Sequence, residues 1–479
     1  MMTSLPLLRG ASISLADALA DDDNILHRLD LPRKQDEFWT RLRSYKSAIE
    51  DMVSFHLRVS HCHVADEADW LSGSYNVCIP VQLNPPSDER VLVRIPLPFK
   101  IATYIWIREH CPTVPVPFLY GFSFPTGVTY AVPASVSFWS RLRWNVIRTV
   151  RTWLGLPPTC PYIRLERSSR LPTGYMIISF VGTGQMLSNT LPAHLLNDKI
   201  RRNTLFHDLA KIILSLNRTP LPRIGSLTLT NRPLTLRLQN FENEAIPTIP
   251  RASASTSTYD SIEPYLLDLL QLHNNRITHQ PNAIHDLQDG QEQLAALTMM
   301  RALLPDFISR TYRTGPFVLT LTDLHPSNIF VDDDWHITSL FDLEWACSFP
   351  VEMQTPPYWL SGRSIDDIEH GENLRRFDEI ISSQGHHEYS AISHAGIMRR
   401  CWESGAFWYF QAVQSPKGLL RVFNEHIQRR FCEGHCTQRV FDRVVSHYWC
   451  VGAEGYIQRK VEEARYKDRL RRRFGEVGH

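Results

Sequence analysis

The chain has 479 residues, of which 43% are hydrophobic and 21% are charged, values typical of a globular protein with a sizeable core. A formal net charge of +1, from 51 basic and 50 acidic side chains, argues against a generally basic nucleic-acid-binding protein and against an acidic disordered one. The 9 scattered cysteines do not resemble a disulfide framework and favour a reducing compartment.

No apolar run is long enough to predict a transmembrane helix. The start of the chain makes a poor secretory signal, because Arg9 interrupts the apolar stretch and no basic region precedes it. We expect a cytoplasmic protein. A mitochondrial location is the alternative, because the serine-containing start has no acidic residue before Asp17.

Residues 1–60 predict a helical N-terminal extension. After Pro32, apolar residues recur at steps of four and three, which predicts one amphipathic packing helix that carries Phe38, Leu42, Tyr45, Ile49 and Met52. Residues 61–182 then predict a strand-rich part. Its expected elements are strands over Tyr75–Leu83, Val91–Leu97 and Tyr175–Val181, and a helix over Ile101–His110.

The segment 138–158 interrupts the strand pattern with a basic amphipathic helix. Its arginines are Arg141, Arg143, Arg148 and Arg151, and they alternate with Leu142, Val146, Val150 and Leu154. We expect an inserted helix whose apolar side packs on the protein and whose basic side faces water. Contact with a membrane surface is the alternative.

Helical periods dominate residues 183–460, with helices predicted over Leu205–Leu216, Ser261–His273 and Leu287–Leu303. Residues 461–479 predict a basic tail, expected to be a solvated helix end. Strands first and helices second is the order of an α+β fold with two lobes.

A short strand and a hairpin are predicted in the segment from Phe317 to Trp345, which reads FVLTLTDLHPSNIFVDDDWHITSLFDLEW. Strands are expected over Val318–Leu321, Ile329–Val331 and Trp335–Phe341. The acidic triplet Asp332–Asp334 between the last two strands is a turn signal.

Polar residues flank this hairpin. Asp323 and Asn328 precede it, and Asp342 and Glu344 follow it, so we expect Asp323, Asn328 and Asp342 to converge at its open end. An amide oxygen and a carboxylate suit Mg²⁺, which commonly binds substrate phosphates as well. A further carboxylate can deprotonate an attacking hydroxyl. This is the arrangement of kinase-type phosphoryl transfer.

The run TDLHPSNIFVDDDWHITSLFDLEWA resembles the catalytic and metal-binding core of the aminoglycoside phosphotransferase-like kinases, and is most similar to their fungal branch. The stretches WLSGSYNVCIPV and VLVRIPLP resemble the first strands of that branch, and the likeness covers Trp70 to Trp359 in patches. The resemblance implies a protein-kinase-like fold, with a small β-rich N-lobe, a larger helical C-lobe and ATP between them.

The resemblance also implies roles for individual residues. Asp323 matches the catalytic base, and Asn328 and Asp342 match the Mg²⁺ ligands. The cofactor-binding residues that it implies are Ser72, Gly73 and Ser74 in the loop over the nucleotide phosphates, Arg94 on the phosphates, and Phe180, Val181 and Gly182 in the hinge that contacts adenine.

The sequence departs from the family pattern at three places. Leu321 stands where the family usually has His, two residues before the catalytic Asp. Arg94 stands where kinases use Lys, which is not a conservative exchange. Lys100 lies where an acidic partner is usual, and Glu109 is the nearest acid. A natural deletion and a mispredicted exon boundary explain this junction at residues 96–102 equally well.

We therefore expect an ATP- and Mg²⁺-dependent kinase that phosphorylates a hydroxyl of a small molecule, without a nucleic-acid partner. A nucleotide-binding pseudokinase or scaffold without phosphoryl transfer is the alternative. A protein kinase is disfavoured, because no Ala-Pro-Glu segment follows Asp342.

A zinc site near the C-terminus is also disfavoured. The candidate ligands Cys432, His435, Cys436, His447 and Cys450 lack the spacing of a standard ligand pair. An apolar stripe on a packed helix, formed by Val440, Val444, Tyr448 and Val451, is the competing interpretation.

Overall fold

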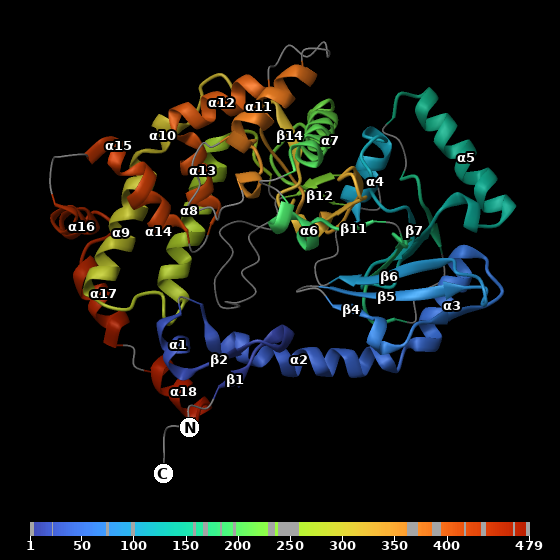
Figure 1. Ribbon diagram of the computed structural model, residues 1–479, viewed down its shortest axis with the longest axis horizontal. Helices are drawn as coiled ribbons and strands as arrows, with labels where there is room; N and C mark the ends of the chain where they lie inside the picture. The colour runs from blue at the N-terminus through green and yellow to red at the C-terminus, as the bar shows by residue number, and fades with distance from the viewer. Residues whose placement is uncertain are drawn as a thin grey trace.

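The computed structural model describes residues 4–21, 23–72, 76–96, 101–156, 160–165, 171–182, 184–194, 198–228, 235–237, 258–361, 372–385, 394–415, 418–432, 437–462 and 465–475. A strand-rich lobe and a helix-rich lobe lie at opposite sides of the molecule (Figure 1). The predicted α+β fold, with a small N-lobe and a larger helical C-lobe, is confirmed. Among the helices of these ranges, none combines the length and hydropathy that a membrane span requires.

The N-lobe is built on an antiparallel sheet with strand order β3-β5-β6-β10-β7-β8-β9, and β4 pairs with β5. The strand bounds are β3 Cys62–Val64, β4 Leu71–Ser72, β5 Asn76–Leu83, β6 Arg90–Pro96, β7 Leu119–Ser123, β8 Thr129–Ala131, β9 Ile163–Leu165 and β10 Tyr175–Ser179. The predicted strands at β5, β6 and β10 are therefore present, with ends that differ by one or two residues.

Helices cover both faces of this sheet. Successive residues of a strand point to opposite faces. Val93 of β6 accordingly packs in one cluster with α3 (Lys46–Leu57), while Leu92 belongs to the cluster that contains α4 (Ala102–His110). Arg94 follows this alternation, so its side chain lies on the α4 face of the sheet.

The prediction of a single helix after Pro32 is wrong. The structure has α2 (Ile25–Arg43), which runs through Pro32, and α3, separated by a turn at Ser44 and Tyr45. The side chain of Ser44 closes this turn by donating to the carbonyl of Arg41. The apolar period continues across the break because residues of both helices are buried in one cluster, so periodicity alone does not detect it.

The basic helix is present as α5 (Phe138–Trp153), but its predicted packing is wrong. None of its residues is buried, and its large apolar side chains face solvent. α5 is inserted in the connection between β8 and β9 and lies at the periphery of the N-lobe (Figure 1).

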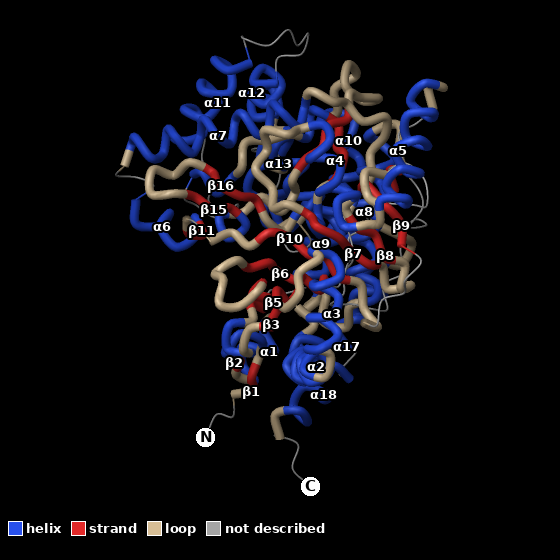
Figure 2. The backbone as a smooth tube through the Cα atoms, turned by 90° about the vertical axis from the view of Figure 1, so that its right-hand side faces the viewer, coloured by secondary structure: helices blue, strands red, loops and turns tan. Residues whose placement is uncertain are grey.

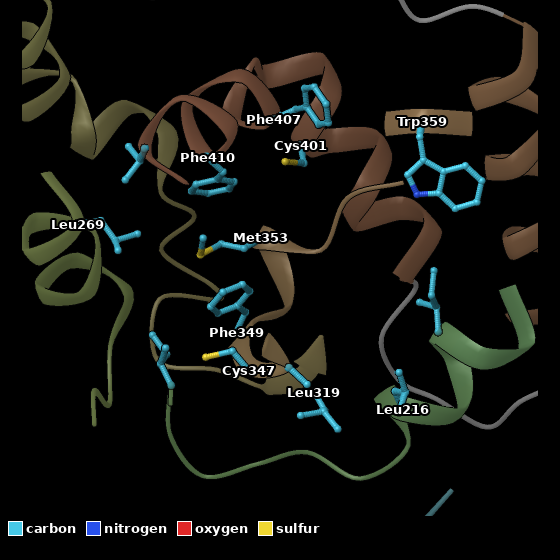
Figure 3. Close-up of a cluster of buried hydrophobic side chains, with 14 of the residues drawn as sticks. Leu216, Leu269, Leu319, Cys347, Phe349, Met353, Trp359, Cys401, Phe407 and Phe410 are labelled. Carbon is cyan, nitrogen blue, oxygen red and sulfur yellow. The ribbon is translucent and has the colours of Figure 1, made fainter. Parts of the chain in front are cut away.

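The C-lobe combines long helices with short strand pairs. Its described helices include α7 (Lys199–Asn217), α8 (Ile262–His279), α9 (Leu287–Ala302), α11 (Glu372–Gly385), α12 (His394–Ser404) and α13 (Ala406–Gln414). α7, α8 and α9 confirm the three helices predicted from the sequence. Figure 3 shows part of their core, in which Leu269, Met353 and Phe410 surround strand residues such as Leu319 and Phe349.

The C-terminal segment does not end as a solvated helix. α18 (Arg465–Arg473) buries Tyr466 and Leu470 against α1 (Leu15–Ala20) and α2. The hydroxyl of Tyr466 accepts a hydrogen bond from the backbone of Ile25 at 2.9 Å. The first and last described segments consequently lie together at one end of the molecule, as both views show (Figures 1 and 2).

The predicted apolar stripe near the C-terminus is exposed, because α16 (Gln438–Ser446) buries Phe441 and Ser446 instead. Its solvent-facing residues are Val440, Val444, Tyr448 and Val451. Of the zinc candidates, His435 and Cys436 and the side chain of Cys432 lie outside the described residues, and Cys450 is an exposed free thiol.

Candidate functional site

The catalytic hairpin brings the ends of its two strands together. β15 (Ile329–Val331) pairs with β16 (Ile337–Leu340), with Ile329 opposite Leu340. One step outward, the backbone of Phe341 donates to the carbonyl of Asn328 at 2.9 Å. Asn328 and Asp342 therefore lie side by side at the open end of the hairpin. The buried residues Ile329, Val331 and Leu340 fix this register, because a shift by one residue would expose them.

Asp323 is tied to Asn328. The amide nitrogen of Asn328 donates to the backbone carbonyl of Asp323 at 2.9 Å and to its carboxylate at 3.2 Å. Since the amide nitrogen makes these two bonds, the amide oxygen is the atom of Asn328 that suits a cation.

The carboxyl group of Asp323 has a shifted pKa. Asp323 is exposed as a residue, yet its carboxyl group is partly desolvated, and this desolvation, together with the nearby Asp342, raises the pKa to about 6. The hydrogen bond from Asn328 acts in the opposite direction. A carboxylate with a pKa closer to neutrality is a better proton acceptor than an ordinary aspartate.

Arg94 joins the N-lobe sheet to the end of the hairpin. Its guanidinium contacts the carboxylate of Asp342 and lies 2.7 Å from that of Glu344. The side chains of Arg94 and Glu344 are each only 3% exposed, whereas that of Asp342 is 29% exposed. The observed partners of Arg94 are thus two carboxylates, and its role on nucleotide phosphates stays a prediction.

The two carboxyl groups beside Arg94 differ in charge. Burial raises the pKa of Glu344 to about 8, despite the opposing effect of Arg94. Burial also acts to raise the pKa of Asp342, but the neighbouring Glu344 and Arg94 lower it overall. At neutral pH Asp342 is therefore the anionic member of the pair, as a cation ligand must be.

The acidic partner of Arg94 comes from the hairpin rather than from the helix. From α4, the buried Tyr104 contributes to the raised pKa of Arg94. Burial raises the pKa of Glu109, at the far end of α4, and the charges that oppose this shift are those of His110 and Arg148. Lys100 lies outside the described residues. Glu344 thus provides the carboxylate that the sequence pattern lacks on α4.

The residues predicted to contact the nucleotide lie at the edge of the N-lobe. Ser72 ends β4, opposite Val77 of β5, and Gly73 and Ser74 lie outside the described residues. Phe180, Val181 and Gly182 follow β10 directly, and the chain then enters β11 (Gln185–Met186).

The strand that follows the N-lobe belongs to the same sheet as the hairpin. β11 pairs with β15, so the segment predicted as the hinge runs into the sheet that carries Asn328. Gly184 makes this approach feasible, because a Cβ atom there would lie 2.4 Å from the carbonyl oxygen of Val331 and its φ is +88°.

The loop that carries Asp323 is anchored on both sides. The hydroxyl of Thr322 donates to the carbonyl of Trp345 at 2.6 Å, and the indole of Trp359 donates to the carbonyl of Leu324 at 2.7 Å. Leu321, which replaces the family's usual His, is partly buried against the C-lobe core. Each contact joins a side-chain donor to a backbone carbonyl.

Sequence reasoning assigned no role to Glu344, Tyr104 or Asn76. Asn76 is the first residue of β5, and its side chain helps to lower the pKa of Asp342 through a hydrogen bond. The spacing between Asp342 and Glu344 was a visible signal, but no local pattern connects either residue to Arg94, 248 positions away.

The donor set fits a hard cation. Asn328 and Asp342 offer an amide and a carboxylate oxygen at the same end of the hairpin, and Mg²⁺ commonly takes further ligands from water and phosphate. Within the described ranges, no group of three or more His, Cys, Asp and Glu side chains is arranged to hold a metal ion.

Residues 155–352 match the model of the phosphotransferase enzyme family, a range that contains Asp323, Asn328, Asp342 and Glu344. The predicted likeness to a phosphotransferase family is therefore confirmed over this range. No curated protein matches the chain.

Two solved structures resemble the chain weakly. The ethanolamine kinase of Plasmodium vivax aligns with a TM-score of 0.37 and 12% identity, over 84% of each chain. A macrolide 2'-phosphotransferase of type I aligns with a TM-score of 0.23 and 9% identity, over 84% of this chain and 96% of the other. Scores this low carry no argument about function.

Proposed function

We propose that the chain is an ATP- and Mg²⁺-dependent phosphotransferase that acts on a hydroxyl group of a small molecule. One observation carries the proposal. The amide of Asn328 bonds to Asp323, and Asp342 follows the residue that pairs with Asn328, at the end of a hairpin in the segment that matches the phosphotransferase enzyme family.

The proposed roles follow from the atoms that each side chain offers. The carboxylate of Asp323 accepts the proton of the acceptor hydroxyl, while the acceptor oxygen forms a bond to the γ-phosphorus of ATP and the bond to the β-phosphate oxygen breaks, which releases ADP. Asn328 and Asp342 hold Mg²⁺, which neutralises charge on the phosphate oxygens.

The other proposed contacts surround the nucleotide. Ser72, Gly73 and Ser74 cover its phosphates, and the backbone at Phe180, Val181 and Gly182 contacts adenine. In this proposal Arg94 balances the charge of Asp342, which it contacts, and of the phosphates, because its guanidinium has several donors.

Asp323→Asn tests the proposal. With Mg²⁺ and a panel of sugars, amino alcohols and aminoglycosides, we expect the wild-type protein to release ADP in an acceptor-dependent manner. Loss of the base lowers this rate by about a thousandfold. Asp333→Asn is the matched control, since Asp333 is an exposed acid in the hairpin turn, and it should retain the rate.

Two outcomes contradict the proposal. Normal turnover by the Asp323→Asn protein removes the assigned base. Thermal stabilisation of the wild-type protein by Mg²⁺ and ATP, without turnover on the whole panel, favours the nucleotide-binding pseudokinase instead.

A further inference from the structure

The helix α5 exposes an unusually large apolar surface for its length. None of its 16 residues is buried. Trp139 is 75% exposed and Trp153 is 84% exposed, and the other exposed apolar residues of α5 are Phe138, Leu142, Val146, Ile147 and Val150. A contiguous exposed apolar patch of this kind marks an interaction surface more often than a solvated one.

The attachment of α5 to the N-lobe determines which side faces outward. Trp144 is half-buried and its indole donates to the carbonyl of Cys160 at 3.3 Å, beside the small cluster that includes Val136 and Ile163. Trp153 follows Trp144 by nine residues, which is about 2.5 helical turns, so it lies on the opposite side of the helix. The apolar face around Trp153 therefore points away from the protein.

The polar residues of α5 are arranged around this face. The helix contains four arginines and no acidic residue. At about 100° per residue, Arg143 lies at one border of the apolar face and Arg141 towards the other, whereas Arg148 lies on the side of Trp144, with its guanidinium 5.2 Å from that ring. Arginines in such positions extend their guanidinium groups towards phosphate while their apolar stems cover neighbouring apolar surface.

A second copy of the chain is a poor partner for this surface. In a two-fold symmetric contact, the same surface meets itself. Arg141 and Arg143 of one α5, which border the apolar face, would then lie near those of the other, with no acid on either helix between them. An anionic partner has the complementary charge.

The aromatic residues narrow the choice of anionic partner. Phe138 and Trp139 lie at the start of α5 and Trp153 at its end. Tryptophan side chains favour the headgroup region of a bilayer, where an apolar ring meets apolar chains and its N–H meets water. Figure 1 shows α5 at the edge of the molecule.

We propose that α5 binds the surface of a membrane that contains anionic phospholipids, with its apolar face between the headgroups and its arginines on the lipid phosphates. This site is independent of the proposed phosphotransferase activity. The helix has 16 residues, four of them charged, and lies on the surface rather than crossing it.

Vesicle flotation tests the proposal with the full chain. We expect the protein to float with vesicles of phosphatidylcholine that contain roughly one-third phosphatidylserine, and to bind pure phosphatidylcholine at least about tenfold more weakly. The double variant Trp139→Ser/Trp153→Ser should lose affinity by on the order of a hundredfold, because two exposed tryptophans no longer enter the headgroup region. Arg141→Gln/Arg143→Gln should lose about tenfold or more.

A matched control separates α5 from exposed apolar surface in general. Tyr448 is 78% exposed and Val451 is 105% exposed, and both lie in the stripe beside α16. Tyr448→Ser/Val451→Ser should float like the wild-type protein. Circular dichroism and thermal unfolding should show that all variants are folded, since every substituted side chain is exposed.

Several outcomes overturn the proposal. It fails if the wild-type protein does not float with anionic vesicles, or if both double variants on α5 float unchanged. It also fails if the control variant loses as much affinity as the tryptophan variant. Concentration-dependent dimers in sedimentation velocity that the tryptophan substitutions dissociate, with no vesicle binding, would identify a second copy as the partner instead.

Discussion

Arginines in two regions of the N-lobe have opposite environments. Arg94 is almost completely buried and has two carboxylates from a distant part of the chain within reach. The arginines of α5 lie on a helix with no acidic residue and no buried position. In both regions the sequence places Arg beside apolar residues. The difference therefore arises from whether another segment of the chain covers the element, which is a property of the tertiary structure.

The largest expected effect is that of Arg94→Met. Removing the guanidinium leaves the anionic Asp342 without its cation, beside the buried Glu344, so we expect the free energy of unfolding in urea to fall by about 3 kcal/mol. Arg164→Met is the matched control, because Arg164 is an exposed arginine on β9, and its effect should stay within about 0.5 kcal/mol. Equal stability of the two variants would mean that Arg94 is not the counter-ion described here.

A smaller, pH-dependent effect is expected at a second buried carboxyl group. Burial raises the pKa of Glu352 to about 7, although its carboxylate accepts a hydrogen bond from the backbone of Ser309 at 2.8 Å. The folded protein therefore holds a proton that the unfolded chain releases above its ordinary pKa of 4.5. Stability from this group is complete below that value and is lost as the pH rises through about 7.

Glu352→Gln measures this contribution, because glutamine keeps an acceptor and does not titrate. Relative to the variant, the wild-type protein should lose on the order of 2 kcal/mol of unfolding free energy between about pH 5 and pH 8. Glu403→Gln, at an exposed glutamate, should follow the wild-type curve. A constant difference between wild type and Glu352→Gln at all pH values would contradict the raised pKa.

The smallest expected effect is that of Trp153→Ser in α5. The side chain is 84% exposed, so the free energy of unfolding should change by less than about 0.5 kcal/mol. Trp106→Ser in α4 is the comparison, because Trp106 is 3% exposed and its removal should cost about 3 kcal/mol or more. Marked destabilisation by Trp153→Ser would show that α5 is covered by the chain itself.

Local patterns predicted most elements but not their partners. The strand Ile329–Val331 was predicted with its observed bounds, because alternation and a turn signal are encoded in neighbouring residues. The break at Ser44 was missed, since buried residues continue on both sides of it. The fungal branch of the family and the roles of the site residues stay predictions.

In the candidate site, too, local patterns predicted some features and missed those that depend on tertiary contacts. The spacing of Asp323, Asn328 and Asp342 in the sequence predicted that they converge. The hairpin register explains why they lie near one another. The contact of Arg94 with Glu344 was not predicted, because it depends on how the two lobes meet. The packing of α5 was predicted wrongly for the same reason, since an amphipathic pattern does not state what covers the apolar side.

The contact between Arg94 and the hairpin also limits how the molecule opens. Arg94 belongs to a strand of the N-lobe, whereas Asp342 and Glu344 belong to the C-lobe. Moving the lobes apart would therefore separate a buried guanidinium from two carboxyl groups. We expect any such separation to carry the electrostatic cost of leaving Arg94 without these partners.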